Sequence, residues 1–215
     1  HLFPPPLSTS LLPLPPRRPT LPAMPATEML PLFPLNTVLL PGAGLGLRVF
    51  ERRYLDLIRE CGRSGRGFGV CLILQGGEAG APATPAAYGT EATIEDFGTG
   101  SDGLLTLRLR GGRRFHVQRT RVRDNGLVVG EVDWCPPEDD DELRPEHGLL
   151  ATVLEKIFEK AGATPPGMTA ADLDSAAWVG WRLAELLPLS DAQRLAVLQE
   201  DDPHARLDHL LALMA

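Results

Sequence analysis

The chain has 215 residues, of which 43% are hydrophobic and 23% are charged, so it is long enough for one large core or two modest ones. Its formal net charge of −7 argues against a protein whose main role is to coat nucleic acid. No apolar run reaches the length of a membrane span, and three separated cysteines (Cys61, Cys71 and Cys135) favour the cytoplasm over a disulfide framework or a zinc site.

Residues 1–27 form a proline-rich tail. Prolines recur every few positions, which excludes a helix or a central strand and predicts extended or polyproline II conformations. Pro13, Pro16 and Arg18 fit a P-x-x-P-x-R pattern that could dock in an aromatic groove. The favoured alternative is that this segment precedes the natural start of the protein, at Met24 or Met29.

Residues 29–87 mix strand and helix signals. The stretch MLPLFPLNTVLLPG, 29–42, combines β-formers with prolines and predicts edge strands and bends. Residues 51–62 carry apolar side chains at helical spacing, with Glu51 at the start and Gly62 at the stop, and predict a short amphipathic helix. The segment 67–74, GFGVCLIL, is expected to be a buried strand, and 75–87 a loop.

Three hairpin signals follow: Ser101-Asp102-Gly103, Gly111-Gly112 and Asn125-Gly126. They separate segments in which apolar and polar residues alternate, as in the LLTLRLR stretch. We expect four or more antiparallel strands in a meander. Together with the edge strands and one helix, they predict a small closed or half-closed β-barrel.

The periodicity changes after residue 135. Residues 136–147 are rich in acids and proline and are expected to be a solvated linker, since contiguous carboxylates lack the spacing of a calcium loop. Two helices are expected over 149–162 and 170–187. A third should start at a capping box formed by Ser190 and Gln193, and a fourth at Asp202-Pro203. The fourth helix should bury Leu207, Leu210, Leu211 and Met214. The predicted class is therefore α+β, with a β domain over 28–135 and a helical subdomain of about four helices over 148–215.

Five sequence motifs follow one another along the chain: LPLFPLNTVLLPGAGLGLRVFERRY, FGVCLI, YGTEATI, LRGGRRFHV and DNGLVVGEVDW. From residue 29 to its end the chain resembles the Lon protease N-terminal (substrate-binding) domain, and looks most similar to stand-alone members in which F-E-x-R-Y opens the first helix. The ending LAELLPLSDAQRLAVLQEDDPHARLDHLLALM is similar to the helical segment that follows the barrel in Lon. The resemblance implies a PUA-like barrel with an appended bundle. Gly46 and Arg52 stand where many relatives carry proline, so the local groove shape is expected to differ.

The chain lacks the signals of the ATPase and protease that accompany this domain in Lon. It contains no G-x-x-x-x-G-K-[ST] motif, and Lys156 and Lys160 fall on the polar face of one predicted helix. The serines read as loop or cap residues, and no serine, histidine and acid are grouped. We therefore expect a protein without catalytic residues, cofactor or metal.

The first functional hypothesis is a polypeptide-binding module that holds unfolded or exposed apolar segments, with a separate protease as a second partner. The expected groove is lined by Phe33, Leu35, Phe50, Arg53 and Tyr54, and it lies at the seam between barrel and bundle or along an edge strand such as LPLFPL. For Arg53 and Tyr54 a structural interpretation competes and is favoured. In it, Tyr54 faces the core and Arg53 pairs with a carboxylate or carbonyl of the barrel.

The alternative hypothesis is an RNA-binding domain that uses Arg119, Arg121 and Arg123 of the arginine-rich stretch 110–123. Alternation there places Phe115 and Val117 in the core, and Arg114 and His116 outward. Acidic residues lie close by, and the stretch has no aromatic platform for stacking bases. A solvated face is therefore favoured, and nucleic acid is the less favoured partner. The sequence leaves the oligomeric state open.

Overall fold

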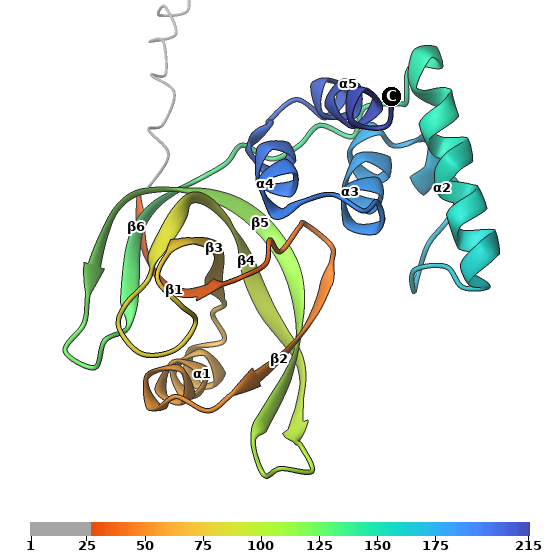
Figure 1. The fold of residues 1–215 in the computed structure, drawn as a ribbon. Coiled ribbons are helices and arrows are strands. Elements are labelled where there is room, and N and C mark those ends of the chain that lie inside the picture. Colours follow the sequence, from red (N-terminus) through yellow and green to blue (C-terminus); the bar gives the residue numbers. More distant parts are fainter. Residues whose placement is uncertain (1–26) are drawn as a thin grey trace, which may run out of the picture.

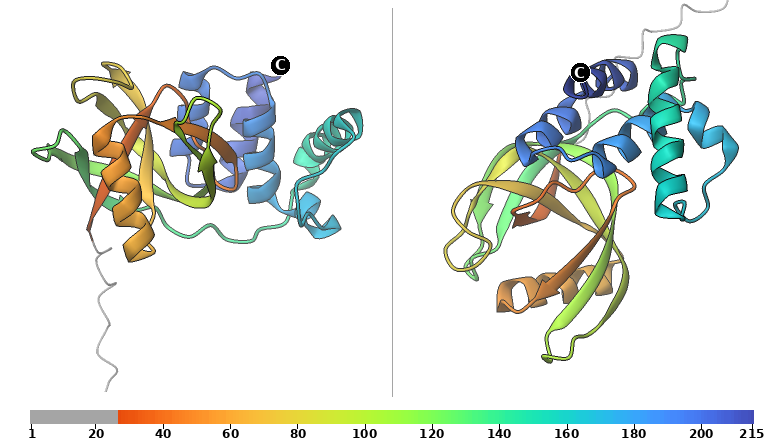
Figure 2. Two further views of the ribbon diagram at one scale, coloured as in Figure 1. Left: turned by 90° about the horizontal axis from the view of Figure 1, so that it is seen from below. Right: turned by 45° about the vertical axis from the view of Figure 1, so that its right-hand side comes forward.

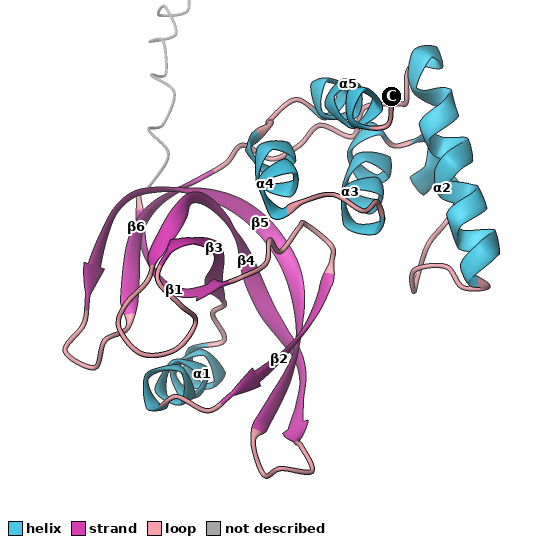
Figure 3. Cartoon of the chain, viewed as in Figure 1, coloured by secondary structure: helices cyan, strands magenta, loops and turns pink. Residues whose placement is uncertain are grey.

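The computed structural model describes residues 27–215, in which one six-stranded sheet precedes most of the helices (Figures 1 and 3). The predicted α+β class is confirmed. The expectations for the proline-rich tail, including the pattern at Pro13, Pro16 and Arg18, lie outside the described residues. The strands are β1 (Glu28–Leu35), β2 (Gly44–Val49), β3 (Phe68–Gln75), β4 (Thr84–Thr99), β5 (Leu105–Val122) and β6 (Val128–Trp134). The helices are α1 (Arg52–Ser64), α2 (Gly148–Ala161), α3 (Ala176–Leu186), α4 (Asp191–Gln199) and α5 (Pro203–Leu213).

The strands pair in the order β2-β5-β4-β3-β1-β6, and β6 also pairs with β5, so the pairing returns to a strand already in the sheet. Strand β1 makes this possible by changing partner halfway along. Residues 28–31 run antiparallel to β6, and residues 32–35 run parallel to β3. Among the described residues, each half of β1 thus pairs with one strand, as at the edge of a sheet. An edge position tolerates proline, here Pro31 and Pro34.

The predicted turn at Gly111-Gly112 is wrong, because β5 continues through both glycines. Gly111 instead meets the loop between β1 and β2: its N–H donates to the carbonyl of Ala43 and its carbonyl accepts from the N–H of Gly42, both at 2.8 Å. A Cβ at this position would lie 2.2 Å from the carbonyl oxygen of Leu40. Glycine is needed here for the close approach of two backbones, and a reverse turn plays no part.

The other two hairpin predictions are confirmed. Gly103 and Gly126 have φ of 81° and 87°, left-handed values that glycine adopts without steric cost, and each lies in the turn between two antiparallel strands. Helix α1 also forms as predicted, but it ends at Ser64, two residues beyond Gly62. Gly65, with φ of 68°, caps it by donating its N–H to the carbonyl of Cys61.

The helical part follows the prediction with one break. The helix expected over 170–187 is split, since Ser175 is extended and its side chain accepts a hydrogen bond from the N–H of Trp178, which starts α3 as a new helix. The capping box of Ser190 and Gln193 is present, and α5 starts at Pro203. Met214, predicted to be buried, is 39% exposed because it follows the last turn of α5. No helix within residues 27–215 combines the length and the apolar character that crossing a membrane requires.

Helices α3, α4 and α5 lie over one end of the sheet, and α2 lies further out (Figures 1 and 2). Arg114 of β5 points out of the sheet interior, as alternation requires, but these helices cover it and leave it 5% exposed. Its guanidinium donates to the carbonyl of Leu198 and to Asp201, both at 2.9 Å. The expectation that Arg114 belongs to a solvated face is therefore wrong.

The acidic segment 136–147 packs against the helices at Glu138. The carboxylate of Glu138 accepts hydrogen bonds from the indole of Trp181, at 2.9 Å, and from the guanidinium of Arg206. Arg206 is fully buried and stacks over the Trp181 ring, 3.5 Å from its centroid. The expectation of a solvated segment is therefore wrong at Glu138, which neutralises a cation in the interior.

Candidate apolar binding clefts

A three-stranded arm projects from the sheet, formed by β2, the end of β4 and the start of β5 (Figure 1). Strand β3 pairs with β4 over residues 84–92, and in the described part of the chain the remainder of β4 pairs with β5 alone. Leucines of β2 and β5 face each other across this pairing, Leu45 with Leu109 and Leu47 with Leu107. They give the arm an apolar inner face, and helix α1 lies across from it.

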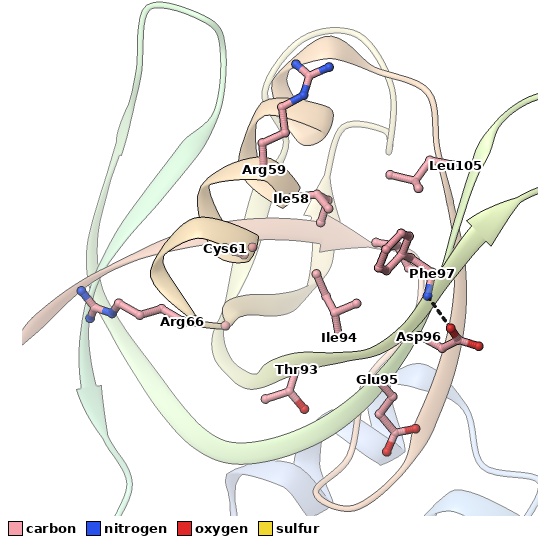
Figure 4. A pocket seen from close by; sticks show the side chains of 14 residues that line it. Ile58, Arg59, Cys61, Arg66, Thr93, Ile94, Glu95, Asp96, Phe97 and Leu105 are labelled. Atoms are coloured by element: carbon pink, nitrogen blue, oxygen red, sulfur yellow. Dashed lines mark hydrogen bonds between the residues drawn. The ribbon is translucent and has the colours of Figure 1, made fainter.

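The first cleft lies between α1 and this arm and has a volume of about 600 Å³. Figure 4 shows Ile58 of α1 and Ile94, Phe97 and Leu105 of the arm converging on it. Phe97 is 74% exposed and adjoins the other apolar side chains of the cleft, so together they form a contiguous apolar surface in a hollow. We call this space the α1 cleft.

A second cleft, of about 790 Å³, lies along β2 and is lined by Leu45, Leu47, Phe50 and Leu104 among others. We call it the β2 cleft. Phe50 at its rim is 59% exposed. Leu107 lines both clefts, so the two meet on the inner face of the arm. Each cleft therefore offers an apolar wall and one exposed phenylalanine.

The charged residues at the α1 cleft are paired with one another or with neighbours. On the helix side, Arg59 pairs with Asp56 at 3.1 Å, and Arg66 with Glu28 at 3.3 Å. On the arm side, Glu95 and Asp96 point away from the cleft (Figure 4). They pair with Arg110 and Arg108.

The hydrogen bonds from Arg110 hold the pKa of Glu95 below its usual value. These pairings leave the interior of the cleft to apolar side chains, so its chemistry is that of apolar recognition.

The thiol of Cys61 also lines the α1 cleft. Burial raises its pKa to about 11, so it is protonated at neutral pH and is a poor nucleophile. The hydroxyls of Ser175 and Ser190 act as helix caps, and Lys156 and Lys160 are exposed. Across residues 27–215 no three or more His, Cys, Asp or Glu side chains are grouped so as to hold a metal ion.

Four of the five residues predicted to line a groove are buried. Phe33, Leu35, Arg53 and Tyr54 are each at most 6% exposed, and Phe33 stacks on Tyr54 with ring centroids 3.8 Å apart. Arg53 donates to the carbonyl of Gly126 at 3.0 Å, as its structural interpretation expected. Their side chains support the surface from below. Phe50 alone of the five is well exposed, and Leu35 reaches the floor of the β2 cleft.

The three arginines of the alternative patch lie near the end of β5. Arg119 pairs with Glu131 and Arg123 with Glu60, each at 3.0 Å. These pairings lower the positive charge available to a phosphate backbone, because affinity for nucleic acid depends on several unneutralised cations. The structure therefore places the arginines together without giving them a strongly basic surface.

The residues that the sequence analysis missed are Ile94 and Phe97. Simple alternation puts positions 94 and 97 on opposite faces of a strand, which concealed their shared role. A register shift between Ile94 and Asp96 inserts an extra residue and brings both side chains to the same cleft. Two large apolar residues three apart in a strand segment were the available signal.

Comparison with known proteins identifies the fold. A family model, the ATP-dependent protease La (LON) substrate-binding domain, matches residues 29–215. The chain belongs to this family. The resemblance noted from the sequence is therefore confirmed.

Two solved structures are similar to the chain. The Lon N-terminal domain protein from Xanthomonas campestris is 68% identical, with a TM-score of 0.76, over 87% of this chain and 99% of that chain. The N-terminal domain of the Mycobacterium avium complex Lon protease is 17% identical, with a TM-score of 0.61, over 86% and 97%. The latter shows a common fold. Among the curated proteins no relative matches.

Proposed function

We propose that this protein is a polypeptide-binding module that holds exposed apolar segments in the clefts on the inner face of the arm, without peptidase or ATPase activity of its own. The observation that carries the proposal is the 74% exposure of Phe97 beside an apolar cleft of about 600 Å³. Membership of a substrate-binding family supports the same function. Partners are unfolded chains and, in this proposal, a separate protease that receives them.

The finer fold class and the division of the chain are separate proposals. The closed order of strand pairing favours a PUA-like barrel over residues 28–135, followed by the connecting segment 136–147 and a helical subdomain over 148–215. The free thiols of Cys61, Cys71 and Cys135 favour the cytoplasm.

The test is fluorescence anisotropy of a labelled, permanently unfolded polypeptide titrated with the protein, with a labelled single-stranded RNA in parallel at physiological salt. We expect saturable binding of the polypeptide and none of the RNA. Phe97→Ala should weaken binding by about ten- to hundredfold, because burying a phenylalanine contributes about 1.5–3 kcal/mol.

Leu149→Ala is the matched control, since Leu149 on α2 is 64% exposed and lies outside both clefts. Equal weakening by the two substitutions would contradict the assignment to the α1 cleft. Salt-sensitive RNA binding without a polypeptide signal would overturn the proposed function and move the site to Arg119, Arg121 and Arg123.

A further inference from the structure

The free edge of the arm lies beside the α1 cleft. Within residues 27–215, strand β4 loses its pairing with β3 after Ala92 and continues to Thr99 paired with β5. Residues 95–99 are all exposed. Backbone polar groups along such an edge can pair with another extended chain.

The direction of the peptide groups at this edge follows from two hydrogen bonds. The N–H of Gly100 donates to the carbonyl of Leu104 at 2.8 Å, so position 100 faces β5. The N–H of Phe97 donates to the carboxylate of its neighbour Asp96 at 2.9 Å, so it is not used in the ladder with β5. Because peptide groups alternate along an antiparallel strand, positions 97 and 99 face outward.

The side chains at this edge define two environments. Phe97 is opposite Leu107 and lies at the cleft, whereas Asp96 is opposite Arg108 and points away from it. A strand added beside β4 would place every second side chain over the apolar cleft and the others beside the exposed carboxylates of Glu95 and Asp96.

We infer that the polypeptide is bound as an added strand along residues 93–99 of β4, with alternate apolar side chains in the α1 cleft. This inference rests on the proposed function and specifies its substrate: an extended segment in which apolar residues alternate with polar or basic ones. Basic residues at the intervening positions would lie favourably beside the carboxylates of Glu95 and Asp96, whereas acidic residues there would be repelled. The bond between Phe97 and Asp96 occupies the edge in the absence of substrate and is exchanged on binding.

The test uses a labelled 12-residue peptide in which leucine or valine alternates with lysine or threonine. Two derivatives carry backbone N-methyl groups, one at the apolar positions and one at the intervening positions, so each lacks donors along one edge. All three are titrated with the unaltered full chain. A strand added in one direction uses one edge, so we expect one derivative to lose about tenfold or more in affinity and the other to bind nearly as the parent does.

The outcomes separate this inference from the proposed function. Parental affinity of both derivatives, or an equal loss in both, would overturn strand addition while binding of the parent peptide upholds polypeptide recognition. Failure of the parent peptide and of the unfolded polypeptide together would overturn both.

A pair of protein variants gives a second readout. Asp96→Ala removes the acceptor that occupies the N–H of Phe97, whereas Asp96→Asn keeps an acceptor oxygen, and both remove the charge. We expect the alanine variant to bind the parent peptide about two- to tenfold more tightly than the asparagine variant. Equal affinities would count against pairing at Phe97.

Discussion

Replacing Arg114 by alanine should weaken the attachment of the helices to the sheet. Arg114 donates to the carbonyl of Leu198 and to Asp201, and its side chain is 4% exposed. An unpaired buried carbonyl costs about 1–3 kcal/mol. The pair with Asp201, which is 57% exposed, adds at most about 1 kcal/mol. We therefore expect Arg114→Ala to lower the free energy of unfolding by about 1–4 kcal/mol.

The adjacent Arg113 provides the control. It pairs with Glu91 at 2.9 Å and lies over the ring of Trp134, but its side chain is 61% exposed. Arg113→Ala should lower the free energy of unfolding by about 1 kcal/mol. Urea unfolding followed by tryptophan fluorescence measures both variants. Equal midpoints for the two would refute the view that Arg114 fixes the helices to the sheet.

Three further predictions concern single positions. Gly111→Ala should destabilise the protein by about 1–3 kcal/mol, because its Cβ would meet the carbonyl of Leu40, whereas Gly112→Ala, whose nearest new contact is 3.5 Å, should be tolerated in the same urea assay. Ser190→Ala should cost about 1 kcal/mol by removing the cap of α4, measured by thermal unfolding. Burial raises the pKa of the Cys71 thiol to about 12, so iodoacetamide at pH 8.5 should not modify it in the folded chain, as peptide mapping would show.

Each of these has a contradicting result. Equal stability of the two glycine variants would mean that the backbones at Gly111 are free to separate. An unchanged melting temperature for Ser190→Ala would show that the cap of α4 does not contribute to the stability of the fold. Alkylation of Cys71 under native conditions would show that its environment opens.

The raised pKa of Cys71 sets the direction in which the free energy of unfolding changes with pH. The folded chain holds this proton more tightly than the unfolded chain, whose thiol has a pKa near 9.0. The resulting stability is complete below pH 9 and is lost as the pH rises toward 12.

Local rules predicted the parts of the fold that depend on neighbours in sequence. The Asn125-Gly126 turn, the capping box at Ser190 and the start of α5 at Pro203 each require only a few adjacent residues. The prediction for Gly111 was wrong because the group that requires a glycine there, the carbonyl of Leu40, belongs to a residue distant in the sequence. No local pattern distinguishes a glycine in a turn from one that admits another backbone.

The candidate site was less predictable, for a related reason. Arg114 and Glu138 look like surface residues by pattern, and only the docking of the helices buries Arg114 and partly buries Glu138. Phe33 and Tyr54 were predicted to line a groove, but both are buried in the structure, which removes their side chains from contact with a ligand. Phe97 emerges as a site residue only when the bulge after Ile94 is known.

The central claim, that an apolar polypeptide lies between α1 and β4, is tested most directly by photo-crosslinking. A 12-residue peptide of alternating leucine and lysine, with one leucine replaced by a benzophenone-bearing residue, is irradiated with the full chain, and the attachment sites are mapped by mass spectrometry. The account predicts attachment at those residues of 58–67 and 93–97 that line the α1 cleft. Attachment confined to the helical subdomain, or to the arginines at the end of β5, would contradict it.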